Sequence, residues 1–230
     1  MDTQTLIDNA VENGQKALSE FDSKKILAAY GIPVSQEYLA SDAKEAVQKA
    51  EEIGYPVVMK ACSHEIAHKT EGGLVEISLN STEEMKAAFE RILTKTDTPL
   101  DGILVQEMVA GKRELMLGLV RDPQFGPCVM VGFGGIMTEI IKDTCFRMAP
   151  VDEIEALDML EEFKSKDLLG PFRGNAPVDK KNLCNAISAI GKIGLENDDI
   201  SEIDINPLII RSDGTFAAVD ALIVIGRGTK

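Results

Sequence analysis

The stretch SEIDINPLIIRSDGTFAAVDALIVI, residues 201–225, specifies its own structure more closely than any other part of the sequence. Two apolar runs rich in β-branched residues flank a turn at Ser212-Asp213-Gly214. A three-residue loop with glycine in the left-handed conformation is typical of a β-hairpin. The turn sets an antiparallel register in which Asn206 lies opposite Asp220, close enough for both side chains to contact one cation.

Asn206 and Asp220 are therefore candidate ligands of one metal ion. An amide oxygen and a carboxylate are hard ligands, of the kind that Mg²⁺ uses together with waters and substrate phosphates. The same residues also suit a plain hairpin, because Asn-Pro and Asp-Gly pairs are common in turns. From the hairpin alone, a magnesium site and a solvated turn both remain open.

The residues before this hairpin predict a mainly antiparallel second half. Short apolar runs alternate with Gly, Pro and Asp, which is typical of strands joined by turns. We expect strands at 114–120, 128–133, 136–141 and 145–148, and helices at 152–162 and 180–193.

The first half alternates between helical and strand patterns, as an α/β lobe does. Helices are expected at 3–19, from Asp22 or Ser23 to Gly31, from Ser41 or Asp42 to Gly54, and from Ser81 to Ile92. Strands are expected at 34–39, 56–61, 74–79 and 103–108. Ala110-Gly111 then interrupts the pattern and predicts a hinge between two lobes near 109–112.

Composition and charge exclude several classes of protein. The chain has 230 residues and a formal net charge of −14, which argues against coating nucleic acid, since that requires basic stripes. No apolar run approaches the ~20 residues of a membrane span, and no secretory signal is visible. The four cysteines are far apart, which favours buried thiols in a reducing compartment. We expect a cytoplasmic protein that binds neither nucleic acid nor membrane.

Two further features could contact phosphate. Lys60 ends the strand PVVMK on the same face as Val58. Near phosphates it would act as a point charge, whereas the alternative is a surface lysine whose stem lies along the sheet. The glycines of Gly132-Phe133-Gly134-Gly135 could bring backbone amides to an anion, or they could simply form a tight turn.

Both histidines of the chain lie in the segment His64-Glu65-Ile66-Ala67-His68. This segment matches the zinc-protease pattern, which requires a helix and a third protein ligand. Here it follows a strand directly and soon reaches Gly72-Gly73, so it fits that class poorly. In a glycine-flanked loop, His68 could instead accept a phosphoryl group on nitrogen as a covalent relay.

Five segments together carry a resemblance in their order and spacing. They read ILAAYGIPV, GYPVVMKACSHEIAHKTEGG, ILVQEMVAGKRELMLGLVRDPQFGPCVMVGFGGIMTEIIKD, SEIDINPLII and FAAVDALIVI, and they span about Leu18 to Ile225. The sequence resembles the ATP-grasp β subunit of ADP-forming acetyl-CoA (acyl-CoA) synthetases and, more distantly, the β subunit of succinyl-CoA synthetase. His64 stands where members of the family usually have proline.

The resemblance implies an α+β (α/β-type) fold, the ATP-grasp fold, in which two lobes clasp a nucleotide. Residues 1–109 would form the N-terminal lobe with its leading helices, and residues 110–230 the C-terminal lobe. His68 matches a histidine that carries a phosphoryl group, and Lys60 matches a lysine that contacts phosphate. Arg147 matches an arginine that is also expected to meet phosphate.

The resemblance assigns the remaining site residues to the nucleotide and its metal. In the segment 106–109, backbone groups of Glu107 and Val109 match those that contact adenine. Glu114 matches an acidic residue on the ribose side. Asn206 and Asp220 match the Mg²⁺ ligands, in agreement with the hairpin register obtained from the residues alone.

The resemblance also implies a reaction and a partner. The reaction is acyl-CoA + ADP + phosphate ⇌ acid + CoA + ATP, the acetate–CoA ligase type, with ATP/ADP and Mg²⁺ as cofactors. A CoA-binding α subunit would make the acyl phosphate, in an α2β2 heterotetramer. Two alternatives remain: a carboxylate ligase of the ATP-grasp type that works alone, and a non-catalytic nucleotide-binding subunit.

Overall fold

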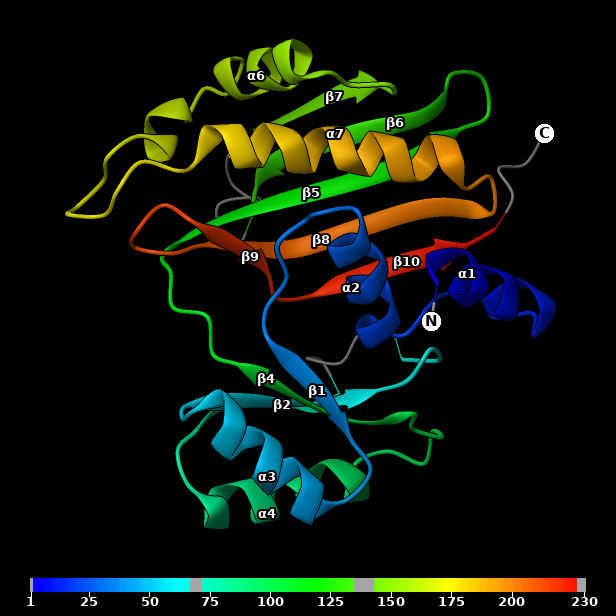
Figure 1. Cartoon of the computed structure of the whole chain (residues 1–230), viewed down its shortest axis with the longest axis vertical. Coiled ribbons are helices and arrows are strands. Elements are labelled where there is room, and N and C mark those ends of the chain that lie inside the picture. Colours follow the sequence, from blue (N-terminus) through cyan, green and yellow to red (C-terminus); the bar gives the residue numbers. More distant parts are fainter. Residues whose placement is uncertain (1, 67–71, 135–142, 227–230) are drawn as a thin grey trace.

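Two β-sheets form the framework of a computed structural model, which describes residues 2–66, 72–134 and 143–226. The smaller sheet has the strand order β1-β4-β2-β3. The larger sheet has the order β10-β8-β5-β6-β7, with β9 also paired to β8. Figure 1 shows the smaller sheet with its two helices below the larger sheet.

The smaller sheet and its two helices enclose a core of their own. The strands are β1 (Glu37–Ala40), β2 (Val57–Cys62), β3 (Val75–Leu79) and β4 (Gly102–Glu107). The helices α3 (Ala43–Ile53) and α4 (Thr82–Thr94) begin at the predicted caps, Asp42 and Ser81, whose side chains accept backbone N–H bonds. Apolar residues of both helices and all four strands form one buried cluster.

All strand pairs of the smaller sheet are antiparallel. The alternation of helix and strand suggested an α/β lobe, in which neighbouring strands are commonly parallel. The structure differs because β4 lies between β1 and β2, so the crossover through α3 does not join adjacent strands.

The larger sheet has one face covered by helices. Its strands are β5 (Arg113–Asp122), β6 (Gly126–Phe133), β7 (Thr144–Met148), β8 (Ile200–Ile210), β9 (Phe216–Ala218) and β10 (Ala221–Ile225). Helices α6 (Glu153–Glu161) and α7 (Lys180–Glu196) lie on this face. The short 3-10 helix η1 (Lys166–Leu169) lies between α6 and α7 in the sequence, and β8 follows α7. Leu115, Leu117 and Leu119 alternate along β5 toward the helices and are fully buried, as the two-residue period of a strand requires.

The leading helices pack on the larger sheet, although the sequence assigned them to the N-terminal lobe. Leu6 and Ile7 of α1 (Thr3–Glu12) and Ile26 and Leu27 of α2 (Glu20–Ala29) belong to the same buried cluster as β5, β8 and β10. The apolar faces of these short helices complete the core beside β10, where α7 does not reach (Figure 1). Ser19, rather than Asp22 or Ser23, caps α2 by accepting a bond from the Asp22 amide.

The segment after α2 connects the two sheets. Its predicted strand, 34–39, is divided: Val34 bridges to Ala218 of β9, whereas β1 begins only at Glu37 and pairs with β4. The divided pairing explains why the strand begins later than its sequence pattern indicates.

The final hairpin has the predicted register. Leu208 pairs with Ala218 on one side of a break at Val219-Asp220, and Ile205 pairs with Ala221 on the other side. From Leu208 to Ile205 the chain goes back three residues, and from Ala218 to Ala221 it goes forward three. The two pairings therefore share one register, which sets Asn206 opposite Asp220. The predicted strand at 136–141 lies outside the described residues. In the described part of the chain, no helix has the length and apolar character needed to cross a bilayer.

Candidate nucleotide site

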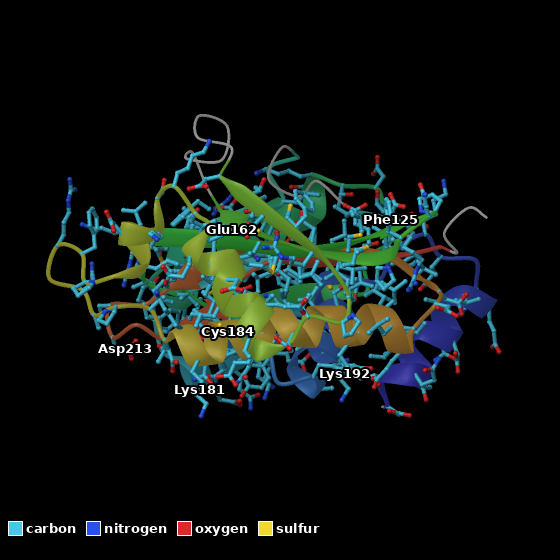
Figure 2. The ribbon with its side chains drawn as sticks, turned by 90° about the horizontal axis from the view of Figure 1, so that it is seen from above. Phe125, Glu162, Lys181, Cys184, Lys192 and Asp213 are labelled. Atoms are coloured by element: carbon cyan, nitrogen blue, oxygen red, sulfur yellow. The ribbon has the colours of Figure 1, made fainter. Side chains whose placement is uncertain are left out.

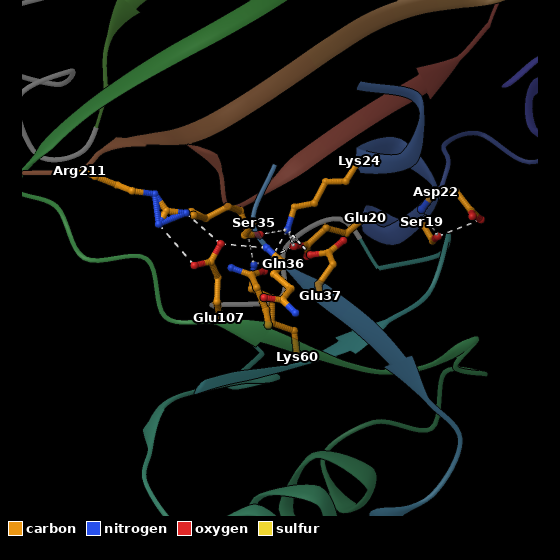
Figure 3. A network of polar contacts seen from close by, with 12 residues as sticks. Ser19, Glu20, Asp22, Lys24, Ser35, Gln36, Glu37, Lys60, Glu107 and Arg211 are labelled. Carbon is orange, nitrogen blue, oxygen red and sulfur yellow. Dashed lines mark hydrogen bonds and ion pairs between the residues drawn. The ribbon is translucent and has the colours of Figure 1, made fainter. Parts of the chain in front are cut away.

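Lys60 lies where the two sheets meet. It is on β2, only 6 % exposed, and its Nζ donates to Oε1 of Glu20 at 2.8 Å and to the carbonyl oxygen of Val219 at 2.7 Å. Both acceptors belong to the part of the molecule built on the larger sheet. The alternative of a solvated surface lysine is therefore wrong, because the ammonium is buried and donates to two acceptors across the junction (Figure 3).

The carbonyl that accepts from Lys60 immediately precedes Asp220. Asp220 lies at the break between β9 and β10, where the Val219 amide donates to the carbonyl of Pro207 at 3.2 Å. Asn206 lies opposite, in the register described above. The fold thus brings Lys60 to the pair Asn206 and Asp220, although 146 residues of sequence separate Lys60 from Asn206.

Behind Lys60 lies a buried polar network that sequence reasoning missed. The ammonium of Lys24 contacts Oε1 of Glu20 at 2.9 Å, Oε2 of Glu37 at 2.5 Å and Oε1 of Gln106 at 2.9 Å. Lys24 is 1 % exposed, and burial acts to lower its pKa, but the Coulombic attraction of Glu20 and Glu37 outweighs this and raises it. Lys24 is therefore charged, and α2 is held against β1 and β4.

The signal for this network was present but ambiguous. Glu20 and Lys24 are one helical turn apart, a spacing typical of exposed ion pairs on helix surfaces. Nothing in the local pattern distinguishes such a pair from one that is buried against a second sheet.

The predicted adenine segment forms the connection between the sheets. The amide of Glu107 donates to the carbonyl of Gln36 at 2.9 Å, and its side chain accepts from Arg211 Nη2 at 2.9 Å. Val109 is buried in a small apolar cluster with Ala217 and Val219. The chain passes from β4 to β5 through residues 108–112, where the sequence predicts a hinge.

Glu114 lies beside this apolar cluster. It pairs with Ile209 across β5 and β8, and Ile209 packs against Val109, Ala217 and Val219. Directly paired residues on antiparallel strands project from the same face of a sheet. Glu114 and the apolar cluster are therefore on the same face of the larger sheet. Asn206 lies on that face too, because its neighbour Ile205 is buried on the helix-covered side.

Arg147 lies apart from these residues. It is on β7, three strands from β8, and its guanidinium pairs with the Glu162 carboxylate that follows α6. It shares the helix-covered face with Cys145, whose Sγ accepts from Arg147 Nη1 at 3.2 Å. The structure does not bring Arg147 together with Lys60, Asn206 and Asp220.

The two histidines are separated by the limit of the described chain. His64 follows β2 and is half-buried, with Nδ1 3.8 Å from Oδ1 of Asp101. His68 lies outside the described residues, as does Gly135. Gly132 and Gly134 are described: a Cβ at Gly134 would lie 3.0 Å from the Leu115 carbonyl oxygen, so close strand packing accounts for this glycine.

The residues at the junction fit a magnesium nucleotide by the chemistry of their donors. Asn206 and Asp220 offer one amide oxygen and one carboxylate, and Lys60 adds a positive charge beside them. In the described ranges, no three His, Cys, Asp or Glu side chains gather into a complete metal site. Two protein oxygens suit Mg²⁺, which usually completes its shell with waters and phosphates.

Comparisons with known proteins agree with this arrangement. The family described as "ATP-grasp domain" matches residues 9–225. The β subunit of acetate–CoA ligase [ADP-forming] I from Pyrococcus furiosus is 42 % identical over 91 % of this chain and 92 % of its own. Acetate–CoA ligase [ADP-forming] I from Archaeoglobus fulgidus is 36 % identical over 97 % of this chain but only 33 % of its own.

Solved structures show the same similarity. Acetyl-coenzyme A synthetase 1 of Ca. Korarchaeum cryptofilum, in complex with coenzyme A, Ca-AMPCP and HgCl⁺, matches with a TM-score of 0.92 and 41 % identity over 97 % of this chain and 100 % of that one. A second structure of that enzyme holds coenzyme A and Mg-AMPPCP, with its phosphohistidine segment pointing towards the nucleotide binding site; its TM-score is 0.86, at 41 % identity and the same coverage. The chain belongs to the ATP-grasp family and, within it, to the β subunits of ADP-forming acetate–CoA ligases.

Proposed function

We propose that this chain is the nucleotide-binding β subunit of an ADP-forming acyl-CoA synthetase, an acid–thiol ligase. It transfers a phosphoryl group between His68 and ADP, and thereby couples acyl-CoA + ADP + phosphate to acid + CoA + ATP. The nucleotide lies between the two sheets, with its phosphates near Lys60 and its base near Val109 and Glu107.

One observation carries this proposal. The Lys60 ammonium donates to the carbonyl of Val219, next to Asp220 and close to the Asn206 position across the hairpin. A cation and two oxygen ligands from separate parts of the chain meet at this point, where the Lys60–Glu20 ion pair joins the two sheets. They are what a nucleoside diphosphate with its metal requires, because several negative charges must be neutralised together.

Different residues of the chain would carry the phosphoryl group, orient the phosphates, hold the metal and contact the base. The P–N bond of phosphorylated His68 breaks, its electron pair returns to the imidazole nitrogen, and a P–O bond forms to the terminal phosphate of ADP. Lys60 would attract and orient the phosphates during this exchange. Asn206 and Asp220 would hold Mg²⁺, which when bound neutralises phosphate charge. Val109, Ile209, Ala217 and Val219 provide the apolar surface for a base, and Glu114 stands beside them for the ribose.

The proposal includes a partner, because the acyl phosphate must be made elsewhere. A relayed histidine allows the two reactions to occur in different subunits. The partner is the CoA-binding α subunit, and we propose an α2β2 assembly.

Because the chain has only two histidines, a phosphohistidine on it can be assigned by substituting each one in turn. The chain is incubated with the α subunit, Mg²⁺ and γ-³²P-ATP, and acid-labile, base-stable label on the chain is measured. His68→Asn is expected to abolish the label on this chain and ATP synthesis, whereas His64→Asn retains both. Normal ATP synthesis by His68→Asn overturns the relay. Turnover without the α subunit supports a ligase that works alone, and nucleotide binding with no label supports a non-catalytic subunit.

A further inference from the structure

The face of the larger sheet that points away from the helices carries two rows of side chains. Strand register places Val224, Glu202, Val120, Cys128 and Met148 in one row across five strands. Leu222, Asp204, Gly118, Met130 and Phe146 form the next row. We call these two rows the open face. Seven of the ten positions are apolar side chains, an unusual density for a sheet face without a covering layer.

No described helix covers the open face. Helices α1, α2, α6 and α7 all contribute to the single buried cluster on the other side of the sheet, and α3 and α4 belong to the smaller sheet. Figure 2 shows α7, marked by Cys184 and Lys192, below the sheet, with Phe125 of the β5–β6 turn on the opposite side.

The apolar side chains at the β7 edge of the open face are strongly exposed. On β7, Phe146 is 52 % exposed and Met148 58 %; in the row of Met148, Cys128 of β6 connects it to Val120 of β5, which is 46 % exposed. A single exposed apolar residue needs no explanation, but a contiguous group is typical of an interaction surface. Methionine and phenylalanine are also enriched at the centres of protein interfaces.

The open face continues directly into the candidate nucleotide site. Asp204 in the second row is two residues from Asn206 on β8, and Leu222 is two residues from Asp220 on the other arm of the hairpin. Alternate residues of a strand project from the same face. The open face and the Asn206–Asp220 pair are therefore on the same side of the larger sheet.

The length of related enzymes indicates what covers the open face. This chain corresponds to 33 % of the single-chain Archaeoglobus fulgidus ligase, so about two thirds of that enzyme lies outside the matched part. In the Pyrococcus furiosus enzyme, the matching protein is a separate β subunit of nearly the same length as this chain. In a two-subunit enzyme of this kind, the counterpart of the other two thirds would meet the β subunit through a non-covalent surface.

Charge argues for this partner over a second copy of the chain. Glu202 and Asp204 lie in the two rows on β8, between β10 and β5, and the whole chain has a net charge of −14. A two-fold symmetric dimer through this face would bring the same carboxylates together. A partner with apolar residues flanked by Lys or Arg would complement both the apolar and the acidic positions.

We propose that the open face is the docking surface for the α subunit, with Phe146 and Met148 at its apolar centre. This inference rests on the proposed function, because it takes its partner from that function. The surface would guide the α subunit onto the same side of the sheet as Asn206 and Asp220.

The test compares two matched pairs of substitutions in the full chain. Phe146→Glu/Met148→Glu changes the open face, and Ile154→Glu/Leu157→Glu changes two exposed apolar residues of α6, of which Ile154 is 72 % exposed. Association with the purified α subunit is measured by calorimetry, and Mg-ADP binding by each isolated variant checks its fold. We expect the first pair to weaken association at least tenfold without changing Mg-ADP affinity, and the α6 pair to leave both unchanged.

A footprint on the unaltered chain covers the case in which the first variant fails to fold. Hydroxyl-radical oxidation of Phe146 and Met148 should fall when the α subunit is added, while oxidation of Ile154 should not. Unchanged oxidation of Phe146 and Met148 in a complex that does form overturns the docking surface alone. Protection of these residues without the α subunit, with dimers in light scattering, assigns the face to a second copy. If the unaltered chain does not bind the α subunit, the proposed function fails, and the docking surface with it.

Discussion

The ammonium of Lys60 and the carboxylate of Glu20 form an ion pair, 2.8 Å from Nζ to Oε1, that joins the two parts of the molecule. Lys60 belongs to the smaller sheet, whereas Glu20 begins the helix α2, whose apolar residues pack beside the larger sheet. Glu20 also contacts Lys24, so one buried carboxylate holds two ammonium groups (Figure 3). Glu20 thus positions Lys60 beside Val219 and Asp220.

Replacing Lys60 by methionine should weaken nucleotide binding more than it destabilises the fold. Methionine fills a similar volume, and Glu20 keeps its contact with Lys24. Removing one partner of a buried ion pair usually costs about 3–5 kcal/mol, and the remaining ammonium should reduce that to about 1–3 kcal/mol. We expect Mg-ADP affinity to fall at least tenfold, measured by calorimetry, with urea unfolding reporting stability.

The matched control removes the neighbouring ion pair instead. The double variant Lys24→Met/Glu37→Met deletes both charges together, which avoids leaving one of them buried without a partner. It should retain Mg-ADP affinity within about threefold, since Lys24 and Glu37 contact each other, Glu20 and Gln106 behind Lys60. Equal losses of affinity in both variants would show that Lys60 acts only through the stability of the junction.

Asp220→Asn should remove most of the dependence of ADP binding on magnesium. The substitution keeps the shape of the side chain but removes the charge that a hard divalent cation favours. With Mg²⁺, ADP affinity is expected to fall at least tenfold, whereas with EDTA the variant and the unaltered chain should bind ADP similarly. The measurement is a calorimetric titration with and without metal.

A second carboxylate of the same hairpin provides the control for this experiment. Asp213 lies in the turn, where its Oδ1 accepts from the Thr215 amide and hydroxyl. Asp213→Asn changes the charge of the hairpin equally, yet it should not alter the effect of Mg²⁺. An undiminished magnesium effect in Asp220→Asn would remove Asp220 from the metal site.

The final hairpin was predictable from sequence because its determinants are local. The turn at Ser212-Asp213-Gly214 and the alternation that follows it are enough to set the register of Asn206 and Asp220, and the structure has that register. The caps Asp42 and Ser81 are local signals of the same kind.

The contacts that complete the site are not local. Lys60 meets Glu20 and Val219 across 40 and 159 positions of sequence, so no periodicity or turn reports them. The packing of α1 and α2 on the larger sheet depends on the part of that sheet beside β10 that the other helices leave uncovered. The apolar pattern of a single helix does not show which sheet it will cover. Arg147 was assigned by position in a motif, and only the strand order places it far from β8.

Two glycines with the same backbone conformation should respond differently to alanine. Gly214 has φ +90°, and an added Cβ would lie 2.1 Å from the Pro177 carbonyl oxygen. Gly126 has φ +76°, with no atom within 4 Å of the added Cβ. Both substitutions incur the cost of a left-handed residue, about 1–2 kcal/mol, but Gly214→Ala must also displace backbone.

We therefore expect Gly214→Ala to lower the free energy of unfolding by about 1–3 kcal/mol more than Gly126→Ala, in urea titrations monitored by circular dichroism. Because Gly214 is in the turn that sets the hairpin register, Gly214→Ala should also reduce Mg-ADP affinity. Similar stability losses in the two variants would mean that the turn is not packed against Pro177 in solution.

Cys145 should titrate well above an ordinary thiol. Burial is the main cause, and the hydrogen bond from Sγ to Glu162 Oε2, 2.9 Å long, adds to it; together they raise the pKa of Cys145 to about 11. The thiolate is the reactive form, so a raised pKa keeps the thiol protonated and moves the midpoint of its alkylation profile to higher pH. We expect that midpoint near pH 11, followed by mass spectrometry of iodoacetamide adducts between pH 7 and 12.

Glu162→Gln separates the carboxylate from simple burial in the same measurement. The amide cannot repel the developing thiolate, and Arg147 loses its ion pair and then stabilises the thiolate instead. The midpoint should therefore move down toward the pKa of an ordinary cysteine, about 8.5. The alkylation rate at the high-pH plateau depends on the access of iodoacetamide to the thiol, and it should change little. A midpoint that does not move would assign the whole shift to burial and leave Glu162 with the pairing of Arg147 alone.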